Sequence, residues 1–257
     1  MGVLNVTPDS FSDGGHFLNP QAAIARAHQM IAEGADIIDL GAESTRPGAS
    51  ALGEQEELDR LLPVLDGLRD IAVPISVDTR RAAVMTAVLE RGADMINDVN
   101  GFRDSASIRA VANSSAALCI MHMQGEPSTM QQAPVYRDVV SEVSEFLYRQ
   151  VDALILSGVS RSRIVLDPGI GFGKTREQNL DLLHSVATLG NDRWPVLIGL
   201  SRKALIGELT GRTVSDRLAG SLGGLIAAAL NGANILRVHD VAQSLDCLKV
   251  AYAVLNR

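Results

Sequence analysis

The sequence predicts a (β/α)8 barrel, and two features lead to that fold. Eight short apolar runs, each carrying Val, Ile or Leu, alternate along the 257 residues with segments of helical periodicity. Such runs are typical of parallel strands that are buried on both faces. Three Gly-Ala-(Asp/Asn) triplets, at 34–36, 92–94 and 232–234, stand where a helical segment ends and an apolar run begins. A glycine at that point favours a helix C-cap that leads into a parallel strand.

Eight strands that alternate with helices in about 250 residues indicate one closed barrel. A doubly wound open sheet is the alternative fold. No linker-like or low-complexity segment divides the chain, so we expect a single domain over residues 1–257. The predicted strands lie at 2–6, 36–40, 74–77, 94–96, 116–121, 164–166, 195–198 and 234–238.

The segments between these runs carry apolar residues at intervals of three and four. The repeat is clear over 22–31, 58–68 and 139–154, which we expect to be helices. Asn19 followed by Pro20 predicts the start of the first of them, because asparagine caps helices and proline fits the first helical position.

Composition and charge exclude several classes of function. The chain is 46% hydrophobic and 21% charged, with a formal net charge of −7, which disfavours a nucleic-acid partner or an anionic membrane surface. No run of about 18 apolar residues predicts a membrane span. Cys119 and Cys247 lie far apart in the sequence, and no close Cys/His pattern indicates a zinc site. Two free thiols fit the reducing cytoplasm.

Polar residues follow the predicted strands, at the end of a barrel where active sites lie. One group consists of Asp78, Asn97, Asp167 and Lys203. Two carboxylates, an amide and an ammonium would match a flat heterocycle with a guanidine-like edge, such as a pterin. An aspartate after a strand is also a common helix N-cap, but four such residues on one rim favour a ligand site.

A second group suits a diphosphate, which needs cations and hydroxyl groups. It consists of Thr45, Arg46, Arg237 and His239, with Asn5 nearby. An ordinary histidine and a solvated loop arginine are the alternatives for His239 and Arg46. The loops 7–18 and 41–53 are long, so each is either a lid over the site or an ordinary flexible loop.

The segment 169–175, Gly-Ile-Gly-Phe-Gly-Lys-Thr, ends like a phosphate-binding P-loop. The first glycine of that motif would fall at Pro168, so we reject the match and expect a close-packed loop at the rim. No arrangement of Cys, His and Asp indicates a covalent nucleophile.

Over essentially its whole length the chain resembles the dihydropteroate synthase family. The resemblance lies in eight ordered motifs: NVTPDSFSDGG at 5–15, ESTRPG at 43–48, SVDT at 76–79, IND at 96–98, MHMQG at 121–125, LDPG and GFGK between 166 and 174, GLSRK at 199–203 and RVHD at 237–240. Family members join a dihydropterin-methyl diphosphate to 4-aminobenzoate and release pyrophosphate. The resemblance also implies a short strand pair before the first barrel strand, so we expect a longer natural N-terminus.

The resemblance implies a role for each motif residue. The implied pterin set is Asp78, Asn97, Met121, Asp167, Phe172, Gly199, Lys203 and Arg237. The implied diphosphate set is Asn5, Thr45, Arg46, Arg237 and His239, with Mg²⁺ near Asn5. The implied 4-aminobenzoate set, where sulfonamides compete in this family, is Phe11, Pro47, Ser201 and Lys203. The residues expected to act in catalysis are Asp13, Arg46, Lys203, Arg237 and His239.

Two other functions compete with the synthase. A pterin-binding methyltransferase on the same barrel, passing a methyl group from a folate to a corrinoid protein, would keep Asp78, Asn97 and Asp167 but would not need the diphosphate set. A catalytically inactive pterin-binding barrel is the other alternative. The family implies a homodimer, and the apolar helix at 219–230 could supply its surface, although a buried helix would look the same.

Overall fold

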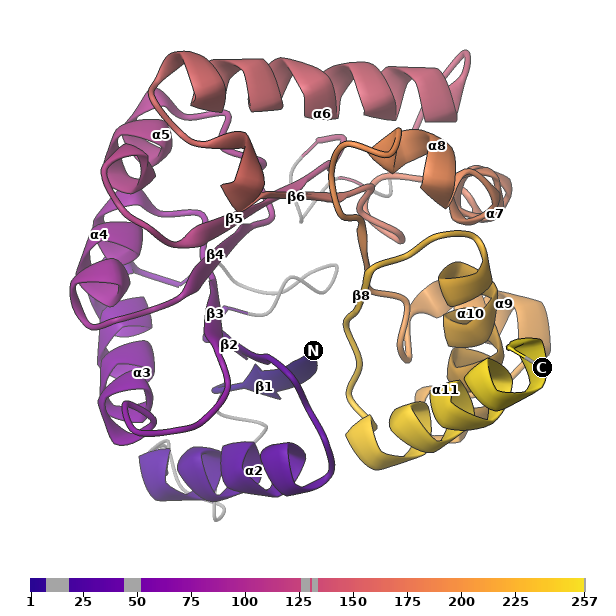
Figure 1. Ribbon diagram of the computed structural model, residues 1–257, viewed down its shortest axis with the longest axis horizontal. Coiled ribbons are helices and arrows are strands. Elements are labelled where there is room, and N and C mark those ends of the chain that lie inside the picture. The colour runs from indigo at the N-terminus through magenta and orange to yellow at the C-terminus, as the bar shows by residue number, and fades with distance from the viewer. Residues whose placement is uncertain (8–18, 44–51, 126–129, 131–133, 257) are drawn as a thin grey trace.

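A computed structural model describes residues 1–7, 19–43, 52–125, 130 and 134–256. The strands form an inner ring and the helices surround it (Figure 1). The strands are β1 (Gly2–Asn5), β2 (Ile38–Gly41), β3 (Ile75–Asp78), β4 (Met95–Asp98), β5 (Ala117–Met121), β6 (Ile164–Asp167), β7 (Leu197–Ile198) and β8 (Ile235–Leu236). Each lies within or overlaps a predicted apolar run, so all eight predicted strands are confirmed.

The strands close into a parallel barrel. Strands β1 to β6 pair in sequence order, and β7 pairs with β8. Backbone hydrogen bonds close the two remaining seams. Leu166 N donates to Pro195 O (2.9 Å) between β6 and the chain entering β7, and Val3 N donates to Val238 O (2.9 Å) between β1 and the end of β8. The (β/α)8 barrel is therefore confirmed, and the open sheet is excluded.

The helices follow the strands in turn and cover the outside of the ring. They are α2 (Pro20–Ala32), α3 (Glu54–Gly67), α4 (Ala82–Glu90), α5 (Ser105–Ala112), α6 (Val139–Leu156), α7 (Arg176–His184), α8 (Val186–Gly190), α9 (Ala204–Thr210), α10 (Leu218–Leu230) and α11 (Val241–Leu255). Short 3-10 helices lie at Arg161–Arg163 and Val214–Asp216. None of the helices in the described ranges is long and apolar enough to cross a membrane.

Local signals at the helix ends act as the sequence predicts. The Asn19 side chain accepts a hydrogen bond from Ala22 N (3.2 Å), and Pro20 is the first residue of α2. Gly34, Gly92 and Gly232 follow helix C-caps with φ of 98°, 90° and 101°. Only glycine adopts this left-handed conformation at little cost, and here it turns the chain from helix into strand.

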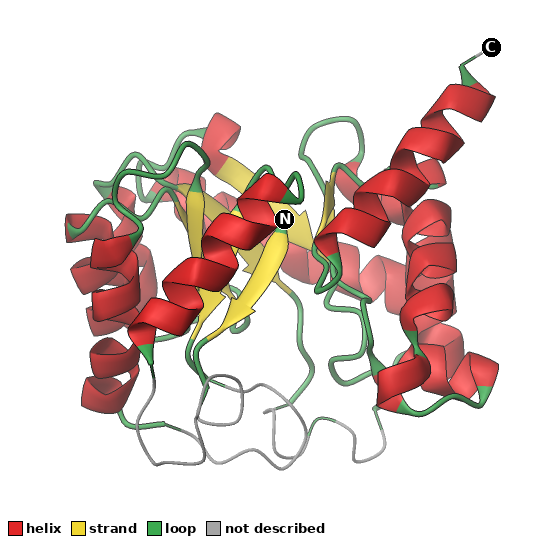
Figure 2. Ribbon diagram, turned by 90° about the horizontal axis from the view of Figure 1, so that it is seen from below, coloured by secondary structure: helices red, strands yellow, loops and turns green. Residues whose placement is uncertain are grey.

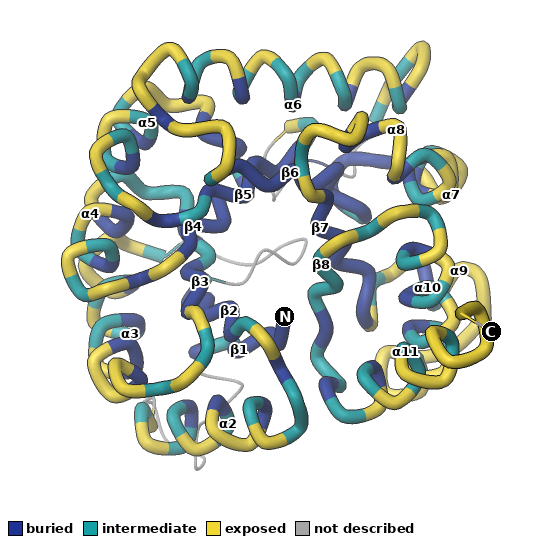
Figure 3. The backbone as a smooth tube through the Cα atoms, viewed as in Figure 1, coloured by how far each residue is buried: buried dark blue, intermediate teal, exposed yellow. Residues whose placement is uncertain are grey.

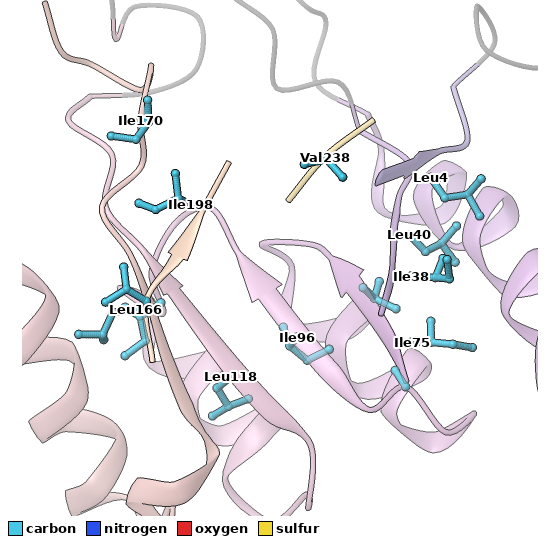
Figure 4. Packing of buried hydrophobic residues seen from close by; sticks show 14 of the residues in the cluster. Leu4, Ile38, Leu40, Ile75, Ile96, Leu118, Leu166, Ile170, Ile198 and Val238 are labelled. Atoms are coloured by element: carbon cyan, nitrogen blue, oxygen red, sulfur yellow. The ribbon is translucent and has the colours of Figure 1, made fainter. Parts of the chain in front are cut away.

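Side chains alternate between the two faces of each strand, and this alternation builds two apolar layers. The outer layer packs between strands and helices and includes Leu4, Leu40, Ile96, Leu118 and Leu166 (Figure 4). The helices turn their buried positions toward it and their exposed positions outward (Figure 3). A smaller inner layer fills the barrel and consists of Met1, Met95, Cys119, Val165 and Leu197.

All strands run toward the same end of the barrel (Figure 2). The inward positions of several strands change from apolar to polar toward their carboxyl ends: Met95 is followed by Asn97 on β4, and Val165 by Asp167 on β6. This order places the inner apolar layer toward the amino ends of the strands. The polar groups lie at the carboxyl ends, where a ligand can reach them.

Candidate active site

The strand register gathers predicted site residues at one level of the barrel. Asn5 is paired with Gly41, Gly41 with Asp78, and Asp78 with Asn97. Neighbours in register point to the same face, so three predicted polar side chains point inward together. A Cβ built on Gly41 would lie 3.4 Å from Asp78 Cβ and 3.8 Å from Asn5 Oδ1. The glycine therefore leaves the space between these two side chains open.

Arg237 links β8 to this group across the barrel. Its Nε lies 2.6 Å from Asp39 Oδ2, and its Nη2 lies 3.2 Å from Asp78 Oδ2. Burial alone would lower the pKa of Arg237, but Asp39 and Asp78 raise it above its ordinary value. The guanidinium therefore stays charged and holds the carboxyl groups of two neighbouring strands, β2 and β3.

Asp78 has a raised pKa in the free protein. Burial raises its pKa from 3.8 to about 8, while Arg237 opposes the shift and Asp39 adds to it. Burial also raises the pKa of Asp167, and Lys203 is the main opposing charge. Acidic groups with pKa values this far from ordinary are typical of functional sites, because binding and proton transfer depend on them.

The loop after β6 organises the other side of the site. Asp167 Oδ1 accepts a hydrogen bond from Gly169 N (2.7 Å). Lys203 Nζ donates to Ile170 O (2.6 Å) and lies 4.5 Å from the centroid of the Phe172 ring. Burial lowers the pKa of Lys203 to about 8, and Asp167 opposes the shift. The loop is close-packed at the rim, as predicted.

Gly199 lies between the side chains of Arg237 and Lys203. A Cβ built there would lie 3.6 Å from Arg237 Cβ and 3.9 Å from Lys203 Nζ. Met121, opposite Asp167 in register, belongs to a buried apolar cluster with Val99, Met123, Met130 and Phe172. A flat ring held by the polar groups would have this apolar cluster beside it.

Ser201 joins the ends of β7 and β8. Its Oγ lies 3.2 Å from His239 Nδ1 and accepts from His239 N (3.3 Å). Burial lowers the pKa of His239 to about 4, and Arg237 adds to the shift. His239 is thus neutral at pH 7 in the free protein. Asp240 forms an ion pair with Arg202, with Nε 3.0 Å from Oδ2.

Comparisons with known proteins agree on one family. The family model described as pterin binding enzyme matches residues 1–239. Dihydropteroate synthase of Escherichia coli (strain K12) is 43% identical over 257 residues, which are 100% of this chain and 91% of that protein. The chain belongs to the dihydropteroate synthase family. The family resemblance found in the sequence motifs is therefore confirmed.

Solved dihydropteroate synthase structures have the same fold. The enzyme of Yersinia pestis with a sulfonamide drug complex superposes with a TM-score of 0.94 at 40% identity, covering 100% of this chain and 94% of that chain. The enzyme of Burkholderia cenocepacia complexed with 7,8-dihydropteroate gives 0.91 at 44% identity, covering 100% and 91%.

The structure describes eleven of the predicted site residues and brings them to one end of the barrel. Asn5, Asp78, Asn97, Met121, Asp167, Phe172, Gly199, Ser201, Lys203, Arg237 and His239 all lie at or beyond the carboxyl ends of the strands. Phe11, Asp13, Thr45, Arg46 and Pro47 lie outside the described residues. Their predicted roles remain predictions.

Three features of the site were missed in the sequence. Asp39 pairs with Arg237 and is fully buried. Its signal is a single aspartate inside the apolar run Ile37-Ile38-Asp39-Leu40, two positions before the inward-facing Gly41. Lys174 is buried beneath the loop after β6. Glu43 pairs with Arg80 (3.3 Å) and Arg81 (2.9 Å), which ties the end of β2 to the start of α4.

A Mg²⁺ site was predicted near Asn5. Among the described residues no group of three or more His, Cys, Asp or Glu side chains could hold a metal ion. Asn5 offers one amide oxygen, which is a hard ligand of the kind that Mg²⁺ prefers. Because Mg²⁺ commonly takes few protein ligands and completes its shell with substrate phosphates and water, the residues fit an ion that binds with a diphosphate.

Proposed function

We propose that this chain is a dihydropteroate synthase, which condenses (7,8-dihydropterin-6-yl)methyl diphosphate with 4-aminobenzoate to give 7,8-dihydropteroate and pyrophosphate. The observation that carries the proposal is the group of Asp78, Asn97, Asp167 and Lys203 at the carboxyl ends of the strands, in a chain of this family. The whole chain, residues 1–257, serves as one pterin-binding barrel domain.

The pterin edge is recognised by the carboxylates and the amide. Asp167 and Asp78 accept hydrogen bonds from ring N–H and the exocyclic amino group, and these donors favour the ionised form of Asp78 when the pterin binds. Lys203 donates to a ring acceptor. Asn97 Oδ1 is buried, and no described residue hydrogen-bonds to it. An unpaired buried acceptor is costly, so a pterin N–H that reaches it gains binding free energy. Met121, Phe172 and Gly199 line the ring, and Arg237 packs over it.

In the reaction, the bond between the pterin methylene carbon and the diphosphate oxygen breaks, and its electron pair leaves with the diphosphate. The arylamine lone pair then forms the C–N bond, and the nitrogen loses a proton. A neutral arylamine is already nucleophilic, so no strong base is required. The protein contributes positioning, stabilisation of charge and exclusion of water.

Positive charge stabilises the leaving group. We assign Asn5, Thr45, Arg46, Arg237 and His239 to the diphosphate, and Phe11, Pro47, Ser201 and Lys203 to 4-aminobenzoate. Asp13, Arg46, Lys203, Arg237 and His239 act in catalysis, with Asp13 placing negative charge near the pterin-methyl cation. Asn5 would hold Mg²⁺ together with the diphosphate, whose negative charge the ion would neutralise when bound.

The test is pyrophosphate release from the dihydropterin-methyl diphosphate with Mg²⁺, with and without 4-aminobenzoate. Release that requires the arylamine and yields dihydropteroate is the expected result. A folded protein that binds the pterin but releases no pyrophosphate would favour the methyltransferase or the inactive barrel instead. Omitting Mg²⁺ in a parallel reaction tests the metal, since we expect turnover to fall without it.

We also propose a homodimer formed through α10 and α11. Leu222, Ile226, Cys247 and Val250 line a hollow between these helices, and Val250 is 66% exposed. The other three are half-buried, and Gln243 and Asp246 also line the hollow. A partly apolar hollow at the surface supports a protein contact, and a second copy of the chain is the partner that closed symmetry favours.

Sedimentation velocity tests the assembly. Val250→Glu places a charge in the proposed interface and should convert dimer to monomer. Leu156→Glu is the matched control, because Leu156 is 88% exposed on α6, on another side of the barrel (Figure 1). A monomeric wild type, or equal dissociation by both variants, would contradict the proposed interface.

We expect no nucleic-acid or membrane partner, because the formal net charge of −7 disfavours binding to either anionic surface. Cys119 and Cys247 are free thiols, which supports a cytoplasmic protein, where thiols stay reduced.

A further inference from the structure

The amino group of Lys174 is enclosed by backbone carbonyl groups. The residue is 3% exposed. Its Nζ donates to Gly169 O (2.9 Å) and Phe172 O (2.9 Å), and lies 3.3 Å from His122 O and 3.0 Å from His122 Nδ1. Burial lowers the pKa of Lys174 to about 7, although the negative charge of Asp167 opposes this shift. Burial also lowers the pKa of His122, to about 2. His122 is therefore neutral and can accept a hydrogen bond from the lysine.

The loop around this amino group has a conformation that glycine makes possible. Gly169 and Gly173 have φ of 68° and 62°. A Cβ on Gly169 would lie 1.9 Å from His122 O, and one on Gly173 would lie 2.5 Å from Gln124 O. The loop is thus pressed against the chain that leaves β5, and the carbonyl oxygens of Gly169 and Phe172 turn toward the lysine. The Lys174 amino group thus binds carbonyl oxygens of three residues, and one of them, Gly169 O, also accepts from Phe172 N (3.0 Å).

The other face of the same loop meets the candidate site. Gly169 donates its N–H to Asp167, Ile170 O accepts from Lys203, and the Phe172 ring lies beneath the Lys203 ammonium. Gly169 and Phe172, whose carbonyl groups accept from Lys174, make two of these contacts. Ile170, which follows Gly169 in the chain, makes the third. A shift of the loop would therefore move acceptor, ring and carboxylate together.

We propose that Lys174 is a positioning residue for pterin binding: its buried amino group serves as a fixed internal hydrogen-bond donor that shapes the loop at 168–173 and so sets Asp167, Phe172 and Lys203 in place. The proposal rests on the proposed function, because it takes those three residues as the pterin set. Lys174 itself touches no substrate.

A matched control exists at the other end of the barrel. Arg163, just before β6, also binds backbone carbonyl groups: Nε donates to Ala116 O (2.7 Å), and Nη2 donates to Val111 O (3.0 Å). Like Lys174, Arg163 donates to several backbone carbonyl groups, but it lies at the amino end of β6, away from the rim. Its loss should cost stability without altering the pterin site.

The experiment compares Lys174→Met and Arg163→Met with wild type. Binding of 6-hydroxymethyl-7,8-dihydropterin is measured by calorimetry, and thermal unfolding is measured alongside. We expect both variants to unfold at lower temperature. Lys174→Met should weaken pterin binding by about tenfold or more, since several buried hydrogen bonds are lost. Arg163→Met should stay within about twofold of wild type, as changes away from a site usually do.

Folded Lys174→Met with wild-type pterin affinity would overturn the proposal, as would an equal loss of affinity in both variants. If Lys174→Met does not fold, Lys174→Gln, which keeps a neutral donor, takes its place with the same expected and contradicting results. A wild-type protein that binds no pterin would instead contradict the proposed function, so the two failures are distinguishable.

Discussion

Arg237 and Asp39 form an ion pair inside the barrel, with Nε 2.6 Å from Oδ2, and the Asp39 side chain is fully buried. The second Asp39 oxygen, Oδ1, is also buried, and no described residue bonds to it. A buried pair of this kind contributes little net stability by itself, but breaking it leaves an unpaired charge. Its value here is that it fixes a cation beside Asp78 at the rim.

Replacement of Asp39 should therefore damage both folding and turnover. Asp39→Ala leaves Arg237 with one carboxylate and should lower the free energy of unfolding by about 3–5 kcal/mol. The rate of pyrophosphate release should fall as well, because Arg237 loses the contact that orients it. Urea unfolding and the release assay measure the two effects.

Asp94→Asn is the control for Asp39. Asp94 Oδ2 accepts a hydrogen bond from Ile75 N (2.8 Å) at the amino end of β3, away from the rim. We expect a modest loss of stability and unchanged pterin affinity. Unaltered turnover in folded Asp39→Ala would show that Arg237 does not depend on this pair.

Asp78 should make stability depend on pH. Its pKa in the folded protein is about 8, against an ordinary value of 3.8. Because the folded pKa is raised, the protonated group contributes stability that is complete below about 3.8 and is lost as pH rises through about 8. Between these values the folded state binds more protons than the unfolded state, so stability falls with rising pH.

Asp78→Asn removes this titrating group, so the difference in stability between wild type and the variant isolates its contribution. Relative to the variant, wild type should lose up to about 1.4 kcal/mol of unfolding free energy per pH unit between pH 4 and pH 8. Urea unfolding at several pH values measures the difference. A difference that stays constant over this range would show that Asp78 keeps an ordinary pKa. The variant should also bind pterin more weakly.

His239 should be neutral at pH 7 until diphosphate binds. Its pKa in the free protein is about 4, and a nearby dianion favours the protonated imidazole. The expected result is a histidine signal that titrates near pH 4 in NMR spectra and moves to higher pH when pyrophosphate is added. Titration at 6–7 without a shift would contradict the assignment of His239 to the diphosphate.

Ser201→Ala tests how His239 is held. The variant removes the hydroxyl that contacts both Nδ1 and the backbone N of His239, and should cost about 1 kcal/mol or less of stability. We expect turnover to fall severalfold with the fold retained, as near- and far-ultraviolet circular dichroism would show. Wild-type turnover would mean that the hydroxyl does not position the histidine.

Gly169→Ala should lower the free energy of unfolding far more than Gly211→Ala does. Gly169 has φ of 68°, and a Cβ would lie 1.9 Å from His122 O. Gly211 has φ of 70° but no atom within 4 Å of its built Cβ. Gly211→Ala should therefore cost about 1–2 kcal/mol, which is the conformational penalty alone. Gly169→Ala should cost clearly more and abolish pterin binding; similar thermal midpoints would show that the loop can move aside.

Strands β1 to β7 could be predicted because they are mostly buried on both faces, which leaves continuous apolar runs in the sequence. β8 is half-buried, but its run is apolar as well. Their carboxyl ends could be predicted for the same reason, since Asp78, Asn97 and Asp167 each interrupt or end such a run. Strands β7 and β8 are shorter than their runs at 195–198 and 234–238, because only two residues of each pair regularly with the other.

The partners of these residues could not be predicted from one sequence. The pair between Asp39 and Arg237 joins residues 198 positions apart, and the sequence gives no register across the barrel. Lys174 stands in the segment 169–175, where the sequence predicts a close-packed loop at the rim but does not show what the lysine binds. In the structure the lysine points inward to backbone carbonyl groups.

The most direct test of pterin recognition is a crystal structure of the protein with the dihydropterin-methyl diphosphate bound. We expect the pterin ring inside the rim of the barrel, with its edge hydrogen-bonded to Asp78, Asn97 and Asp167. The diphosphate should point toward Asn5 and His239. A pterin bound elsewhere on the molecule, or in this site with its edge turned away from those three side chains, would contradict this expectation.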